Sequence, residues 1–459
     1  MTMQKLFIAN RGEIAVRIIR AAQQMGIKTV LGVSEADVDS LAARMADETV
    51  LLGPARASES YLNIPRVMDA IRQSNADAVH PGYGFLSENA AFVAGLEAAG
   101  TAFVGPRSET IAAMGDKAEA RRTAIAASVP VVPGSDGPVA NVADALRLVE
   151  QIGYPLMIKA AAGGGGRGIR IANTPEDLAS VMPVAQAEAK AAFGDDTVYL
   201  ERYLARVRHV EVQILGDGDR VVHLHERECS LQRKRQKVWE EAPAIMLPAS
   251  VREALCNSAV KLAASVGYRG AGTIEYLYED ATREFFFIEM NTRIQVEHPI
   301  TEEITGIDIV QAQLRIARGE RLWLEQDQIR ICGHAIEVRL NAENPARKFM
   351  PNPGKVSRVA VPKSARFDTL LYNGCTVVPF YDSLIGKLVV SGADRDDALQ
   401  KLRTALAELE IEGIATTRDL HCDLVEVADI QAGAVHSLWL ETWLGGKVIQ
   451  PAKAFAGSS

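Results

Sequence analysis

Residues 284–291 are predicted to form a β-strand, in which successive side chains point to opposite faces. On such a strand Glu289 and Asn291 share one face, and the opposite face is expected to be buried. The side chains predicted for the buried face are Phe286, Ile288 and Met290. Carboxylate and amide oxygens on one face are ligands that suit Mg²⁺. The sequence therefore predicts a strand that carries a metal site.

A third oxygen ligand depends on how this strand pairs with the apolar run 272–278. The polar residues 280–283 lie between the two runs and are typical of a turn. A three- or five-residue turn pairs Glu275 with Glu289, whereas a four-residue turn pairs it with Ile288. We expect the first register, with a cation between the carboxylates because they would otherwise repel each other. The alternative is a pair of solvated acids at the edge of a sheet.

Residues 158–171 place a glycine tract between two apolar runs, each too short for a helix. This pattern predicts a flexible hairpin tip whose backbone N–H groups approach phosphate oxygens, with Lys159 adding a positive charge. The spacing matches neither a Walker A loop nor a dinucleotide-binding fingerprint. A plain linker has a similar composition, but the position between strands favours a phosphate-binding lid. The glycines of the tip are Gly163, Gly164, Gly165 and Gly166.

Composition is typical of a large globular protein in a reducing compartment. Its 459 residues are 48% hydrophobic, which is enough for two or three domains. A net charge of -8 argues against nonspecific nucleic-acid binding. Charges interrupt the longest apolar stretches, and no signal-peptide pattern precedes the first strand, so we expect no membrane association. The five cysteines are scattered singly, which suits the cytoplasm.

The first hundred residues alternate short strands with helices, as in a doubly wound sheet. Strands are expected at 6–9, 29–33, 78–80 and 102–104, with an amphipathic helix at 12–25. A long helix is expected at 175–193. The predicted units are a doubly wound domain (1–115), a helical linker (116–130), a mobile lid (131–204), a core with the metal site (205–330), an α+β domain (331–450) and a tail (451–459). Closure of the lid would exclude water from a hydrolysable intermediate.

A series of sequence blocks occurs in order along nearly the whole chain. They are residues 8–15, 80–89, 115–117, the glycine tract, 208–211, 236–243, 287–299 and 381–387. Together they resemble the biotin carboxylases of the ATP-grasp superfamily. The resemblance implies a multidomain fold of the α/β and α+β classes, with a Rossmann-like pre-ATP-grasp domain, an ATP-grasp lid and core, and a C-terminal biotin carboxylase domain.

The resemblance also implies a reaction. Such enzymes use ATP to convert bicarbonate to carboxyphosphate and then carboxylate N1′ of biotin. The implied cofactors are ATP and Mg²⁺ or Mn²⁺, with two ions expected, and biotin is the substrate. Metal ligation falls to Glu275, Glu289 and Asn291. Nucleotide contact falls to Lys117, Lys159, Glu201, Leu204, His209, Gln232 and Arg235, although His209 is also open to a purely structural reading.

For bicarbonate, the resemblance assigns the planar fork of Arg293, assisted by Lys237, Gln295 and the backbone of Val296. Glu297 is the implied base that takes the bicarbonate proton. Arg339 would stabilise the biotin enolate oxygen. The remaining positions near biotin are Tyr83 and Asp382. A tyrosine in a Pro-Gly loop often only packs, and Asp382 is also open to a role as a helix cap.

Three departures from the family pattern concern nucleotide affinity: Ala162 in the lid, Arg235 in place of a common His, and Trp239 in place of a smaller aliphatic residue. After residue 447 no Met-Lys-Met biotinylation site follows. We therefore expect biotin to arrive on a separate carrier protein, and a carboxyltransferase to complete the reaction. The chain is comparable to the homodimeric biotin carboxylase subunit of acetyl-CoA carboxylase, which serves fatty acid biosynthesis.

Alternatives remain at this point. Another ATP-grasp enzyme would pass an acyl phosphate to an amine, and a silent nucleotide-binding partner would bind ATP without turnover. The final acceptor is open among acetyl-CoA, propionyl-CoA and pyruvate. His223 and His225 are zinc-ligand types on one strand, but no third ligand has zinc-site spacing, so we expect no zinc site there.

Overall fold

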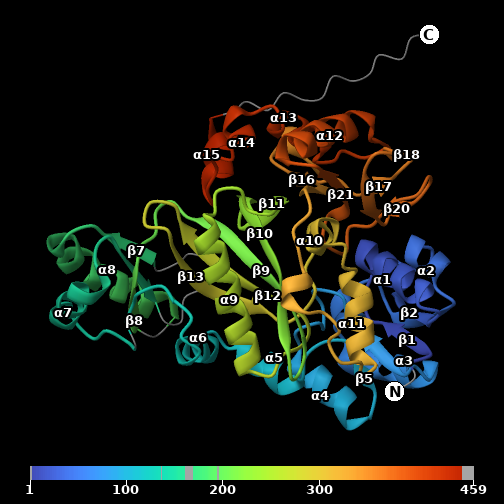
Figure 1. Ribbon diagram of the computed structural model, residues 1–459, viewed down its shortest axis with the longest axis horizontal. Helices are drawn as coiled ribbons and strands as arrows, with labels where there is room; N and C mark the ends of the chain where they lie inside the picture. Colours follow the sequence, from blue (N-terminus) through green and yellow to red (C-terminus); the bar gives the residue numbers. More distant parts are fainter. Residues whose placement is uncertain (1–2, 136, 161–168, 194–195, 447–459) are drawn as a thin grey trace.

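A computed structural model describes residues 3–135, 137–160, 169–193 and 196–446 (Figure 1). Its N-terminal part is a five-stranded parallel sheet in the order β3-β2-β1-β4-β5. The strands are β1 (Lys5–Ile8), β2 (Lys28–Ser34), β3 (Glu48–Gly53), β4 (Ala78–His80) and β5 (Ala102–Phe103). The helices are α1 (Gly12–Gln24), α2 (Leu41–Met45), α3 (Ile64–Ser74), α4 (Ala90–Ala98), α5 (Ser108–Gly115) and α6 (Lys117–Ala126). This is the doubly wound arrangement that the sequence predicts.

Four predicted strands and the first predicted helix are confirmed to within one residue at each end. The sequence pattern missed β3. That strand lies at the edge of the sheet, and most of its side chains are partly or fully exposed, so its apolar pattern is weak. The apolar face of α1, which includes Ile14 and Ile18, packs in one cluster with Ile309 and Leu314. These contacts join the N-terminal sheet to the rest of the molecule.

The lid is a three-stranded antiparallel sheet in the order β7-β6-β8, packed against two helices. Its elements are α7 (Val142–Ile152), β6 (Leu156–Ala160), β7 (Ile169–Ala172), α8 (Pro175–Phe193) and β8 (Val198–Arg202). The long helix at 175–193 is confirmed, whereas α7 was not foreseen. The predicted glycine tip lies outside the described residues. In Figure 1 this unit stands at one end of the molecule.

The largest sheet has eight antiparallel strands in the order β13-β12-β9-β10-β11-β14-β21-β19. They are β9 (Arg208–Asp217), β10 (Val221–Arg233), β11 (Gln236–Ala242), β12 (Arg269–Glu279), β13 (Glu284–Asn291), β14 (His334–Asn341), β19 (Arg366–Thr369) and β21 (Leu384–Gly392). The helices α9 (Ala249–Ser265), α10 (His298–Thr305) and α11 (Ile309–Ala317) pack beside it. Because β11 pairs with β14, one sheet spans the predicted 330/331 boundary, and the domain limits stay predictions.

The remaining elements belong to the C-terminal part. The strands are β15 (Glu343–Asn344), β16 (Met350–Pro351), β17 (Gly354–Lys355), β18 (Arg358–Ala360), β20 (Thr376–Val377) and β22 (Glu410–Glu412). The helices are α12 (Arg395–Glu408), α13 (Arg418–Leu424), α14 (Ala428–Gln431) and α15 (Trp439–Gly445). Trp239 is buried in the same apolar cluster as Ile336 and Leu388, so this departure from the family pattern serves the core.

The β12–β13 hairpin corrects the register argument. Its turn, residues 280–283, has four residues, and Glu279 pairs with Glu284. A β-bulge then leaves Ile288 without a partner, so Glu275 pairs with Glu289 after all. The expectation that a four-residue turn separates the two carboxylates was wrong because one extra residue restores the register. The burial of Ile288 was also predicted wrongly, since 38% of this residue is exposed.

None of the helices in the described residues is both long enough and apolar enough to span a membrane.

A close backbone contact near the end of β9 gives the first test. A Cβ on Gly216 of β9 would lie 2.3 Å from the carbonyl oxygen of Tyr268, so Gly216→Ala must displace backbone. We expect Gly216→Ala to lower the free energy of unfolding by about 1–3 kcal/mol. At Gly115 an added Cβ has open space, so Gly115→Ala should cost nothing or stabilise the helix by up to about 1 kcal/mol. Chemical denaturation of both variants checks this, and equal midpoints would contradict the packing argument.

Candidate active site

A cleft of about 1480 Å³ opens where the N-terminal sheet, the lid and the large sheet meet. It is lined by the predicted site residues Tyr83, Lys117, Leu204, His209, Gln232, Arg235, Lys237, Glu275, Glu289, Asn291, Arg293, Gln295, Val296, Glu297, Arg339 and Asp382. Two predicted residues, Lys159 and Glu201, do not line it and form an ion pair with each other in the lid. The four glycines of the tip lie outside the described residues. One cleft thus gathers residues from distant parts of the sequence.

The predicted metal ligands lie together on β12 and β13. Asn291 Nδ2 donates to Glu275 Oε1 at 2.9 Å, and His209 Nε2 lies 3.1 Å from Glu275 Oε2. Burial and the charge of Glu275 raise the pKa of Glu289, and among the described residues no hydrogen bond or ion pair reaches its carboxylate. A half-buried carboxylate without a partner, beside a second carboxylate and an amide oxygen, fits a hard divalent cation.

Lys237 of β11 is surrounded by three carboxylates. Its Nζ lies 2.5 Å from Glu211 Oε2, 2.9 Å from Glu275 Oε1 and 2.7 Å from Glu297 Oε1. Burial alone would lower the pKa of this lysine, but the three negative charges raise it well above its usual range. Lys237 therefore stays cationic and ties the metal-side carboxylates to Glu297.

Arg227 lies beneath the cleft with a fully buried side chain. Its Nε donates to Glu211 Oε1 at 2.6 Å and its Nη2 donates to Gln295 Oε1 at 2.7 Å. The other N–H groups reach oxygens of Gln213, Thr273 and Thr301. The rigid fork of one guanidinium thus orients side chains from β9, β12 and α10 and the loop before α10.

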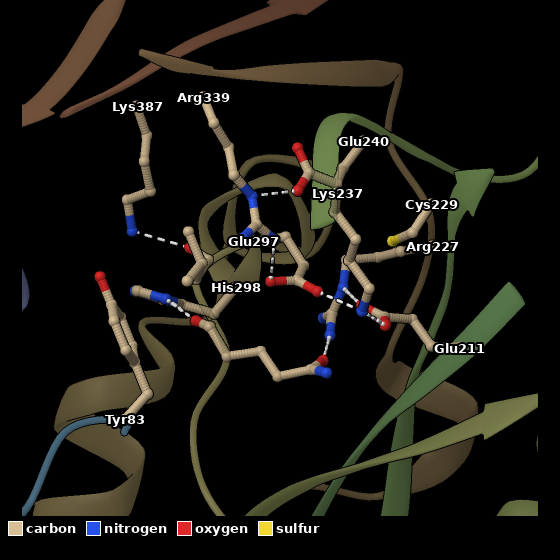
Figure 2. A network of polar contacts seen from close by, with 12 residues as sticks. Tyr83, Glu211, Arg227, Cys229, Lys237, Glu240, Glu297, His298, Arg339 and Lys387 are labelled. Atoms are coloured by element: carbon tan, nitrogen blue, oxygen red, sulfur yellow. Dashed lines mark hydrogen bonds and ion pairs between the residues drawn. The ribbon is translucent and has the colours of Figure 1, made fainter. Parts of the chain in front are cut away.

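The carboxylate of Glu297 is paired with two cationic side chains from different strands. Lys237 of β11 approaches one oxygen, and Arg339 Nη2 of β14 donates to the other at 3.0 Å (Figure 2). Burial tends to raise the pKa of Glu297, but the charges of Lys237 and Arg339 outweigh it and hold the pKa well below its usual range. Glu297 is therefore an anion positioned by two hydrogen bonds, at the N-terminus of α10.

A second carboxylate lies on the far side of Arg339. Glu240 Oε1 accepts from Arg339 Nε at 2.5 Å, and Glu240 faces Glu337 across β11 and β14. Burial raises the pKa of Glu240 to about 7, and burial also raises the pKa of Glu337 well above its usual range. Arg339 is thus held between Glu240 on one side and Glu297 on the other, with a hydrogen bond to each.

The guanidinium of Arg293 is already hydrogen-bonded to other residues. Its Nε donates to Glu88 Oε2 at 2.8 Å, its Nη2 donates to Asn291 Oδ1 at 2.9 Å, and its Nη1 donates to the carbonyl of Ile294. Glu88 also accepts from the Thr292 backbone at 3.0 Å, so it fastens the N-terminal domain to the metal strand. An anion that binds Arg293 through Nε must displace Glu88.

The two predicted biotin residues differ in surroundings. The Tyr83 hydroxyl donates to Glu13, whose other oxygen lies 3.3 Å from Lys387 Nζ. Asp382 is exposed, and its Oδ1 accepts from the backbone of Leu384 at 2.9 Å as β21 begins. The helix-cap alternative for Asp382 was wrong, because a strand follows it.

Charged residues that the sequence reasoning passed over complete the site. The missed residues are Glu13, Glu88, Glu211, Arg227, Glu240, Glu337 and Lys387. One signal for them was present, since β10 carries Glu226, Arg227 and Glu228 consecutively and all three are buried. Consecutive charges inside a long strand indicate a paired polar interior when that strand lies at the centre of a sheet.

Family models cover the chain in three parts. "Biotin carboxylase, N-terminal domain" matches residues 2–111, "Carbamoyl-phosphate synthase L chain, ATP binding domain" matches residues 116–325, and "Biotin carboxylase C-terminal domain" matches residues 337–442.

Individual relatives match nearly the full length. A biotin carboxylase of Pseudomonas aeruginosa is 50% identical over 447 residues, which are 96% of this chain and 99% of the relative. A pyruvate carboxylase subunit of Methanothermobacter thermautotrophicus is 45% identical over 96% of this chain and 90% of its own. The biotin carboxylase domain dimer of Hydrogenobacter thermophilus 2-oxoglutarate carboxylase, solved with MgADP, ADP and bicarbonate, is 43% identical with a TM-score of 0.85. It covers 96% of this chain and 98% of that one.

The buried guanidinium gives the second test. Arg227→Met removes the cation between Glu211 and Gln295 and leaves buried polar groups unpaired. We expect the free energy of unfolding to fall by about 3–5 kcal/mol. The matched control is Arg220→Met, because Arg220 is 47% exposed in its pair with Glu325 and should cost no more than about 1 kcal/mol. Urea denaturation measures both, and a loss at Arg227 no larger than the control would refute the importance of the buried network.

Proposed function

Because the chain belongs to the biotin carboxylase family, we propose that it uses ATP and bicarbonate to carboxylate N1′ of biotin, and that the residues of the cleft carry out this reaction. The observation that carries the assignment of residues is the buried Glu297, held between Lys237 and Arg339 at 2.7 and 3.0 Å. One carboxylate between two cations can exchange a proton beside an anionic substrate.

The first step concerns bicarbonate. Its oxygens bind Arg293, in place of Glu88, together with Lys237, Gln295 and the Val296 backbone. Glu297 takes the proton from bicarbonate as a bicarbonate oxygen attacks the γ-phosphorus of ATP, and ADP leaves. Carboxyphosphate is the product of this step. A bound anion raises the pKa of Glu297 by repulsion, so that the carboxylate accepts a proton.

The second step concerns biotin. Carboxyphosphate separates into CO₂ and phosphate, and the phosphate takes the N1′ proton. Arg339 stabilises the enolate oxygen of biotin, with Tyr83 and Asp382 beside the ring system. N1′ then attacks CO₂, which gives N1′-carboxybiotin. Arg339 is positioned for this role by Glu240, which accepts from its Nε, and by Glu297, which accepts from its Nη2.

The nucleotide site joins the lid and the metal strands. Glu275, Glu289 and Asn291 would hold Mg²⁺ or Mn²⁺, with two ions expected, which would neutralise charge on the phosphates. Lys117, Lys159, Glu201, Leu204, His209, Gln232 and Arg235 contact the nucleotide. The Lys159–Glu201 ion pair lies outside the cleft lining, so these two residues reach the nucleotide only when the lid, residues 131–204 with the tip Gly163–Gly166, closes.

The partners we propose are a biotin carboxyl carrier protein, a carboxyltransferase and a second copy of this chain, in the cytoplasm. Support for a dimer is that the Hydrogenobacter relative is described as a domain dimer. The acceptor proposed first is acetyl-CoA. Pyruvate is the second candidate, because the Methanothermobacter relative belongs to a pyruvate carboxylase.

Turnover tests the proposal. Purified protein with Mg²⁺, ATP and bicarbonate should release ADP faster when free biotin is added. Glu297→Gln keeps the size of the side chain but removes the base, so release should fall by about 10²–10⁴-fold. The control is Glu325→Gln. Glu325 is an exposed acid that does not line the cleft, so this substitution should leave the rate unchanged.

Turnover that ignores both biotin and bicarbonate would refute the assignment and favour an ATP-grasp amine ligase. ATP binding without any turnover would favour a silent nucleotide-binding partner.

A further inference from the structure

Three metal-ligating side chains meet near the start of β10, away from the cleft. They are His223, His225 and Cys256, and their ligand atoms all lie within 4.8 Å of one another. The sequence argument expected no zinc site because no third ligand has the usual spacing. The structure supplies that ligand from α9, which packs against β9 and β10 and carries Cys256 in its first half.

The backbone of β10 directs both histidines to one side. The β9–β10 register is broken between His223 and Glu226, and His225 there has a φ of +64°. Such a backbone angle is uncommon for residues other than glycine. The two imidazole rings consequently lie 5.0 Å apart, centre to centre, at 78°. On a regular strand, the side chains of residues two positions apart point the same way and lie roughly parallel. This bulge instead turns the two imidazole rings toward a common point.

Contacts behind the rings match those around a metal centre. His225 Nε2 lies 3.0 Å from the carbonyl oxygen of Ile329, and donation to this carbonyl leaves Nδ1 with a free lone pair. Gln326 holds the backbone of His223 through two hydrogen bonds, at 2.9 and 3.1 Å. The loop 326–329 thus fixes both histidines before any ligand arrives.

The charges at this place are suited to a cation. Glu226, next to His225 on β10, is completely buried, and its Oε2 has no hydrogen-bond partner among the described residues. Its Oε1 accepts from Arg252 and the Ala244 backbone. Arg252 thus pairs with one oxygen of Glu226, and the other oxygen is an unpaired acceptor in the neighbourhood of Cys256.

We propose that His223, His225 and Cys256 form a binding site for a borderline-soft divalent cation, for which Zn²⁺ is the best chemical match. Two imidazoles and one thiolate are zinc ligands, with water at the fourth position. Binding converts the Cys256 thiol to a thiolate bonded to the metal and releases its proton to solvent. Two of the three ligands are only half-buried, which leaves a path for the ion.

Cobalt spectroscopy on the full-length protein tests this site. After treatment with chelator, the protein is titrated with Co²⁺ in excess Mg²⁺, which occupies oxygen-ligand sites. Thiolate ligation gives a near-ultraviolet charge-transfer band, and one equivalent of Zn²⁺ should abolish it. Cys256→Ser should remove the band, and His223→Gln should weaken Co²⁺ binding at least about tenfold.

Two controls distinguish other outcomes. Cys332→Ser, at an exposed cysteine, should keep the band. Cys229 lies near Glu211 and Glu297 at the cleft, so a band lost in Cys229→Ser but kept in Cys256→Ser would overturn the proposal. Zn²⁺ should also raise the thermal midpoint of the unaltered protein and not that of Cys256→Ser. Absence of a charge-transfer band in the unaltered protein would equally refute the site.

Discussion

The fully buried guanidinium of Arg227 is the interaction on which the active site depends. It lies beneath the cleft and reaches Glu211, Gln213, Thr273, Gln295 and Thr301 within 2.6–3.2 Å. A cation without water must be fully paired, and this one is. Gln295 and Glu211 in turn hydrogen-bond to Glu275 and Lys237. The packing of the strands around Arg227 therefore also determines the arrangement of the anion site.

Charge is balanced locally in this interior. Three cations, Arg227, Lys237 and Arg339, alternate with three carboxylates, Glu211, Glu275 and Glu297. Apolar side chains of similar volume often stabilise a protein as much as buried ion pairs, so stability alone is a weak reason to keep such a cluster. A reaction in which every step handles an anion gives a stronger reason, because rigid cations near its path need no reorganisation.

The sequence predicted the elements of the fold better than their fine register. The apolar run 285–288, followed by Glu289 and Asn291, was sufficient to locate β13. The blocks along the chain named most residues of the cleft. The bulge opposite Glu275 was beyond prediction, because it depends on how β12 and β13 pair and not on the composition of either. Arg227 escaped notice although Glu226, Arg227 and Glu228 are consecutive, because their burial depends on which strands flank β10. Cys256 meets the two histidines only through helix packing.

The most direct test of the role given to Arg227 is the fixation of labelled bicarbonate into carboxybiotin by Arg227→Lys, measured against bicarbonate concentration at saturating ATP. Lysine keeps the charge, but its three donors on one nitrogen cannot reproduce the five hydrogen bonds of the planar guanidinium. The bicarbonate concentration for half-maximal rate should therefore rise by at least about tenfold, while that for ATP changes little. An unchanged bicarbonate requirement in a folded variant would contradict the account.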